Sequence, residues 1–113
     1  MGTFVLRSKK DADRIKEYAK NSTRVVIVGG GVLGLEAASE LKKLGLNVII
    51  VEMASRIFPR QLDEEASKLF EEVISKEDIK IYKNHFVKAI GGENKVEFVE
   101  LDNGKEIKAD MVL

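Results

Sequence analysis

The sequence predicts an α/β fold in which helices flank a parallel β-sheet and an antiparallel β-meander follows. Two short runs rich in β-branched residues, 24–28 and 47–51, enclose an amphipathic stretch that ends near residue 44. Runs of this length and composition are typical of parallel strands that are buried on both faces. After residue 83 the alternation of helix and strand gives way to short strands separated by turns. These observations favour a parallel core with a meander added to it.

The N-terminal part predicts a lead-in helix over about residues 8–21. Ser8 is a suitable N-cap, and Asp11 follows three residues later in a pattern like a capping box. Ile15 and Ala19 lie on one helical face, as expected of a helix that packs on a core. Residues 3–6, which precede this helix, are interpreted as an edge strand or a lead-in.

The parallel core is predicted over about residues 24–83, with a helix at 32–44 between its first two strands. The buried stripe of that helix is expected to contain Leu33, Ala37, Ala38, Leu41 and Leu44. Gly45 suits a left-handed C-cap. A further helix opens at Asp63, and its core face is expected to contain Ala66, Leu69, Phe70, Val73 and Ile74. Residues 79–82 are the predicted third parallel strand.

The last third of the chain predicts a meander over residues 86–108, with strands at 86–90, 96–101 and 105–108. The second connection contains Asn103-Gly104, a preferred two-residue hairpin turn because both positions tolerate positive φ. The apolar run 109–113 opens a further strand. We interpret residues 1–113 as one domain excised from a larger protein, with its last strand truncated.

Composition excludes several classes of function. Lysine plus arginine equal aspartate plus glutamate at 19 each, so no net field attracts nucleic acid or an anionic membrane. The chain has no cysteine and one histidine, His85, which is interpreted as a surface or turn residue. A disulfide, a thiolate metal site and a catalytic triad are therefore not expected. The N-terminus has no signal-peptide pattern, so a cytoplasmic location is expected.

The strongest motif is the glycine run between the first strand and the following helix. Gly29 is expected to turn the chain sharply, Gly31 to leave room for a pyrophosphate, and Gly34 to let the helix pack closely on the sheet. The helix then directs its first-turn N–H groups at the phosphates. Strand, glycines and helix in this order predict a dinucleotide site.

An acid at the end of the second strand completes the motif. Glu52 lies 23 positions after Gly29, where a carboxylate can accept hydrogen bonds from ribose hydroxyls. The same carboxylate would repel a 2′-phosphate, so NADH is expected to be preferred over NADPH. Arg56, four residues on, could instead accept that phosphate, and the strictness of the preference stays open.

Several segments together resemble the NAD(H)-binding domain of the FAD-dependent pyridine nucleotide-disulfide oxidoreductase superfamily. They are Phe4-Val5-Leu6-Arg7, Asp11-Ala12, the run from Val25 to Ala38, Val51-Glu52, Arg56, Pro59, Leu62-Asp63 and Ala109-Asp110-Met111-Val112-Leu113. The likeness covers essentially the whole chain and is greatest to the NADH oxidase, rubredoxin or ferredoxin reductase and nitrite reductase flavoprotein branch. It implies a Rossmann-type FAD/NAD(P)-binding fold.

The resemblance also implies a role within a larger enzyme. The domain would be inserted in an FAD-binding domain, followed by a dimerisation domain, and would hold NADH with its nicotinamide facing a flavin bound elsewhere on the parent chain. A redox protein or small molecule would accept the electrons. Glu36 matches a family glutamate near the nicotinamide. The predicted cofactor-binding residues are Gly29, Gly30, Gly31, Val32, Leu33, Gly34, Glu36, Glu52 and Arg56; none is predicted to be catalytic or to bind metal.

Two alternatives remain open from the sequence. An FAD-binding domain uses the same glycine turn and strand-end acid. FAD-binding domains of the superfamily usually begin almost at the glycine strand, whereas about twenty residues with a capped helix precede it here. A non-enzymatic NAD(H)-sensing domain would couple nucleotide levels to a partner. If the chain is the NADH-binding domain, the isolated chain is expected to bind nucleotide without catalysis, because it carries no second dinucleotide motif and no redox side chain.

Overall fold

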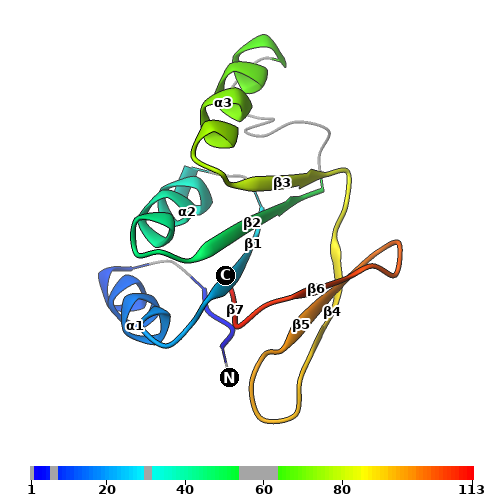
Figure 1. Cartoon of the computed structure of the whole chain (residues 1–113). Coiled ribbons are helices and arrows are strands. Elements are labelled where there is room, and N and C mark those ends of the chain that lie inside the picture. Colours follow the sequence, from blue (N-terminus) through cyan, green and yellow to red (C-terminus); the bar gives the residue numbers. More distant parts are fainter. Residues whose placement is uncertain (1, 6–7, 30–31, 54–63) are drawn as a thin grey trace.

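The chain forms a three-layer α/β arrangement (Figure 1). The computed structural model describes residues 2–5, 8–29, 32–53 and 64–113. The helices are α1 (Lys9–Ala19), α2 (Val32–Lys43) and α3 (Glu64–Lys76). The strands are β1 (Arg24–Val28), β2 (Asn47–Glu52), β3 (Lys80–Lys83), β4 (Val87–Gly91), β5 (Phe98–Leu101), β6 (Glu106–Lys108) and β7 (Met111–Val112). A parallel sheet in the order β3-β2-β1-β7 lies between the helices and an antiparallel sheet in the order β4-β5-β6.

Alternation along the central strands explains the three layers. Val25 and Ile27 of β1 belong to the core under the helices, whereas Val26 belongs to the core under the meander. Strand β2 alternates in the same way, with Ile50 on the helix side and Val51 on the meander side. Because both faces are covered, the strands read as continuous apolar runs, as predicted. The predicted α/β fold with a parallel sheet and a meander is confirmed.

Local signals at the helix ends are also confirmed. Asp11 donates its backbone N–H to Ser8 Oγ at 3.3 Å, so Ser8 caps α1. Gly45 has φ 93° just after α2, and Leu46 N–H bonds the Leu41 carbonyl at 3.2 Å. A left-handed glycine that closes such a bond is a standard helix C-terminus.

The expected core face of two helices is partly wrong. Ala37, Ala38 and Leu41 of α2 are buried, but Leu44 is 56% exposed because it follows the last turn of the helix. On α3, Ile74 is buried, whereas Leu69 and Val73 are 60% and 56% exposed. Helix α3 lies beside the edge strand β3, so the sheet covers a narrower stripe of this helix than its apolar pattern suggests (Figure 1).

The turn between β5 and β6 differs from the predicted two-residue hairpin. Gly104 has φ 87°, but Asn103 is not among the residues with positive φ. Gly104 N–H bonds the Leu101 carbonyl at 2.9 Å, and Leu101 N–H bonds the Lys105 carbonyl at 2.9 Å. This is a three-residue connection in which only the glycine takes the left-handed conformation.

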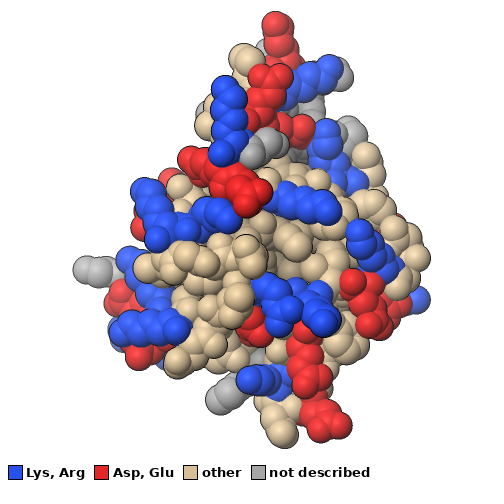
Figure 2. Space-filling view, viewed as in Figure 1, with Lys and Arg blue, Asp and Glu red and all other residues tan. Residues whose placement is uncertain are grey.

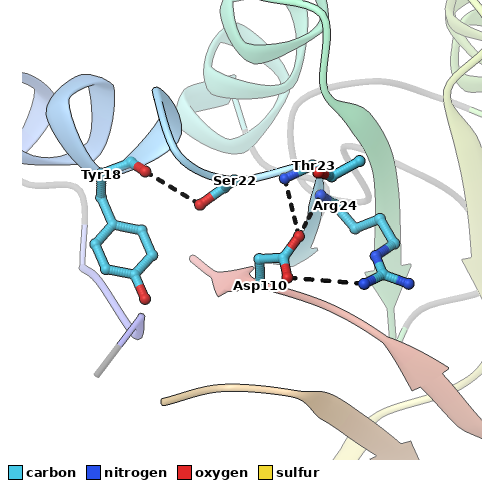
Figure 3. A network of polar contacts seen from close by, with 5 residues as sticks. All are labelled: Tyr18, Ser22, Thr23, Arg24 and Asp110. Atoms are coloured by element: carbon cyan, nitrogen blue, oxygen red, sulfur yellow. Dashed lines mark hydrogen bonds and ion pairs between the residues drawn. The ribbon is translucent and has the colours of Figure 1, made fainter.

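A carboxylate joins the start of β7 to the start of the neighbouring strand β1. Asp110, just before β7, accepts the backbone N–H groups of Thr23 and Arg24 through Oδ2, each at 2.9 Å (Figure 3). Arg24 NH2 lies 3.8 Å from Asp110 Oδ1. Burial raises the pKa of Asp110, but the N–H donors of Thr23 and Arg24 outweigh it and hold that pKa below its usual value. Asp110 therefore fixes β7 against the start of β1.

We expect Asp110→Ala to lower the free energy of unfolding by about 1–3 kcal/mol, because two backbone N–H groups lose their acceptor. The pKa of Asp110 is lowered in the folded state, so its contribution is present above the unfolded value of about 3.9 and is lost as pH falls through the folded value. Urea unfolding at neutral and acidic pH measures both effects. Asp110→Asn keeps an acceptor and should lose the acid-dependent part alone; equal acid sensitivity in this variant would contradict the assignment.

Candidate dinucleotide site

The site lies where β1 and β2 end at the same edge of the parallel sheet. Gly29 follows the last residue of β1, and its backbone N–H donates to the Val51 carbonyl at 2.8 Å. Glu52, which follows Val51, is the last residue of β2. The register pairs Val28 with Val51, so the glycine turn and the acid leave the sheet side by side. Ligands of parallel α/β sheets bind at these carboxyl ends.

The glycine turn and the helix after it are packed tightly. Gly29 has φ 99°, a conformation that favours glycine, and a Cβ there would contact none of the residues that the structure describes. At Gly34, in the first turn of α2, a Cβ would lie 2.7 Å from the carbonyl oxygen of Gly29 and 3.4 Å from Ile27 Cγ2. The absence of a side chain at Gly34 is therefore what allows α2 to begin directly against the turn.

The start of α2 offers a suitable environment for an anion. Its first turn contains no acidic residue, and the unsatisfied N–H groups of a helix start carry partial positive charge. Val32 and Leu33 form the first two positions of the helix, and Glu36 is exposed one turn on. Gly30, Gly31 and Arg56, which were also predicted to contact the cofactor, lie outside the described residues.

An apolar hollow of about 220 Å³ adjoins this turn. Its walls include Phe4, Val28, Gly34 and Leu113. Val28, the last residue of β1, is half exposed beside it. The carboxyl edge of the sheet therefore combines a polar glycine turn with an apolar surface, the combination that an amphipathic nucleotide requires.

The end of β3 is bound to the same edge through His85. Its backbone N–H donates to the Glu52 carbonyl at 3.2 Å, and its Nδ1 lies 2.9 Å from Asp102 Oδ1 in the β5–β6 turn. The hydrogen bond with His85 holds the pKa of Asp102 below its usual value. A second contact links the same elements, because Lys105 Nζ, next to the β5–β6 turn, donates to Tyr82 Oη of β3 at 3.1 Å. His85 lies in the loop between β3 and β4, and there it joins the meander to the end of β2.

Lys83 lies beside Glu52, and no sequence pattern indicated this residue as part of the site. It is the register partner of Glu52 on the neighbouring strand, and its Nζ lies 3.0 Å from Glu71 Oε2 on α3. Strand register depends on pairing between segments that are far apart in sequence, and no local pattern marks it. A cation–carboxylate pair thus borders the position expected to bind ribose.

The remaining surface agrees with the balanced composition. Figure 2 shows basic and acidic side chains interspersed over one face of the molecule, without a field of one sign. Among the described residues, no group of three or more histidine, cysteine, aspartate or glutamate residues is arranged to hold a metal ion. Within the same part of the chain, no helix is long and apolar enough to cross a membrane.

Comparison with known proteins identifies the family. The family model described as pyridine nucleotide-disulphide oxidoreductase matches residues 1–113. The chain belongs to this family. The expected family resemblance is thereby confirmed, and so is the Rossmann-type fold.

Relatives of the pyridine nucleotide-disulphide oxidoreductase family match almost the full chain. An NADH oxidase of Methanocaldococcus jannaschii is 38% identical over 99% of this chain and 25% of its own length. A rubredoxin-NAD(+) reductase of Ectopseudomonas oleovorans is 35% identical over 99% of this chain and 29% of its own length. The chain thus spans less than a third of the length of these two relatives.

A solved structure of the family has the same architecture. The ferredoxin reductase for the CYP199A2 system from Rhodopseudomonas palustris superposes with a TM-score of 0.93 at 28% identity. The match covers 96% of this chain and 27% of that one. The described part of this chain therefore has the fold of one portion of that larger reductase.

Proposed function

We propose that this chain is the NADH-binding module of an FAD-dependent oxidoreductase. In this proposal the module binds NADH at the carboxyl edge of its parallel sheet and presents the nicotinamide to a flavin held by another part of the parent protein. NADH supplies a hydride, and the flavin passes the electrons to a redox protein or a small molecule. The work of this chain is to bind and orient the nucleotide.

The observation that carries the proposal is the hydrogen bond from Gly29 N–H to the Val51 carbonyl at 2.8 Å. It joins the glycine turn to the residue before Glu52, so the expected phosphate-binding element and the expected ribose-binding acid leave the sheet together. Adjacent placement is required because pyrophosphate and adenosine ribose are neighbouring parts of one dinucleotide.

The residues present suit a dinucleotide in two further respects. A Cβ at Gly29 would meet no atom of the described residues within 4 Å, which leaves space on their side of the turn for a phosphate group. The apolar hollow lined by Val28 and Gly34 offers a surface for an aromatic ring. The relatives named NADH oxidase and rubredoxin-NAD(+) reductase, at 38% and 35% identity, support NAD(H) as the nucleotide.

Titration of the folded chain with NADH, NADPH and FAD tests this function. We expect saturable binding of NADH, weaker binding of NADPH and weakest binding of FAD, measured by the change in nucleotide fluorescence. Circular dichroism before titration establishes that the chain is folded. Tighter binding of FAD than of NADH would replace the proposal with an FAD-binding role, and a folded chain that binds none of the three would refute both.

A further inference from the structure

Cofactor choice in this family module is expected to depend on charges around the adenosine ribose, and the structure brings two more charges to that edge. Register pairing puts Lys83 directly beside Glu52 on the adjacent parallel strand. Adjacent strands lie about 4.8 Å apart, so these two positions are immediate neighbours. The inference drawn from this pair rests on the proposed binding of NADH.

Both side chains belong to the helix side of the sheet. Ile50 and Ile81, two residues before Glu52 and Lys83 on their strands, both pack in the core under the helices. Side chains two residues apart on a strand share a face, so Glu52 and Lys83 extend to that side as well. The contact of Lys83 with α3 agrees with this orientation.

The ammonium group of Lys83 forms a hydrogen-bonded ion pair with α3. Its Nζ donates to Glu71 Oε2 at 3.0 Å, and the two side chains are 38% and 19% exposed. An open hollow lined by Lys68, Glu71, Glu72, Lys76 and Lys83 borders this pair. Among the described residues, the lysine is therefore paired with one partly buried carboxylate and remains partly exposed to solvent.

We propose that Glu71 and Lys83 together strengthen the preference of the site for NADH over NADPH. Glu71 pairs with the Lys83 ammonium group on the α3 side, so this cation is not available to bind the 2′-phosphate of NADPH. The formal charges of Glu52, Lys83 and Glu71 sum to one negative charge, which disfavours the additional phosphate. Loss of the Glu71 charge leaves Lys83 available as a phosphate partner and brings this sum to zero.

Three variants test the arrangement: Glu71→Gln, Lys83→Gln and the double variant. Dissociation constants for NADH and NADPH are measured by fluorescence titration at low and high ionic strength. We expect Glu71→Gln to tighten NADPH binding by about threefold to tenfold, and Lys83→Gln to weaken it by a similar factor. The double variant restores the original charge and should return to within about twofold of the unmodified chain. High salt should reduce each change.

NADH serves as the internal control, because neither residue is among those expected to contact it. Its dissociation constant should stay within about twofold in all three variants. Glu72→Gln, which removes the same charge one residue along α3, should leave both constants within the same range. If the pair has a purely structural role, its variants should weaken the binding of NADH and of NADPH by the same factor. That result would overturn the inference.

Two failures have different meanings. If the folded chain binds NADH but Glu71→Gln leaves NADPH affinity unchanged, the role of the pair is refuted and the proposed function stands. If the folded, unmodified chain binds neither nucleotide, the proposed function fails and this inference fails with it.

Discussion

Replacing Gly34 by alanine is expected to weaken NADH binding at least tenfold and to lower the free energy of unfolding by about 1–3 kcal/mol. A Cβ at this position would lie 2.7 Å from the carbonyl oxygen of Gly29, which is a backbone atom and cannot rotate away. Relief requires α2 to move from the turn, and overpacking of this kind costs about that much stability. The same movement displaces the N–H groups that we expect to bind phosphate.

Titration with NADH and urea unfolding measure the two parts of this prediction. Gly104→Ala is a matched control, because Gly104 has φ 87° and lies in the β5–β6 turn, where an added Cβ would meet no described atom within 4 Å. This variant should lose about 1 kcal/mol through backbone strain and keep its affinity for NADH. Unchanged NADH affinity in a folded Gly34→Ala variant would show that the close approach of α2 is unrelated to binding.

The features that the sequence predicted well are those encoded in neighbouring residues. The apolar runs of β1 and β2 are buried on both faces, and such burial leaves a local signature in composition. Ser8 and Gly45 mark helix ends through hydrogen bonds that span only a few residues. The juxtaposition of Gly29 and Glu52 could be expected because a glycine turn and a following acid recur in one βαβ unit.

The features that the sequence did not predict depend on pairing between distant segments. Lys83 meets Glu71 across a separation of 12 residues, and His85 meets Asp102 across 17. The first pair joins α3 to β3, and the second lies at the open end of the β4–β5 hairpin, beyond the paired residues Val87 and Leu101. No periodic pattern in the sequence relates the partners of either pair. The apolar spacing of α3 likewise indicated an apolar face, but not that Leu69 and Val73 would stay exposed beside an edge strand. Local patterns define elements, whereas packing decides how much of each is covered.

Glu52→Gln is expected to reverse much of the discrimination between NADH and NADPH. Hydrogen bonds to a charged acceptor contribute about 1 kcal/mol more than neutral ones, so NADH affinity should fall by about fivefold. Repulsion of a 2′-phosphate is removed at the same time. Two unit charges about 4 Å apart interact by about 4 kcal/mol at an effective dielectric near 20, and solvent at a half-buried strand end reduces this value. The ratio of NADPH to NADH affinity should therefore rise by at least about tenfold.

Glu36→Gln is the matched control for this change, because it removes the same charge from the residue expected near the nicotinamide. NADH and NADPH are identical at that end, so both affinities should change by one common factor. Glu52→Gln should also shift the ratio more than Glu71→Gln, since Glu52 ends β2 itself whereas Glu71 acts through Lys83. An unchanged ratio in Glu52→Gln would remove Glu52 from cofactor selection and leave Lys83 without the neighbour on which its proposed role depends.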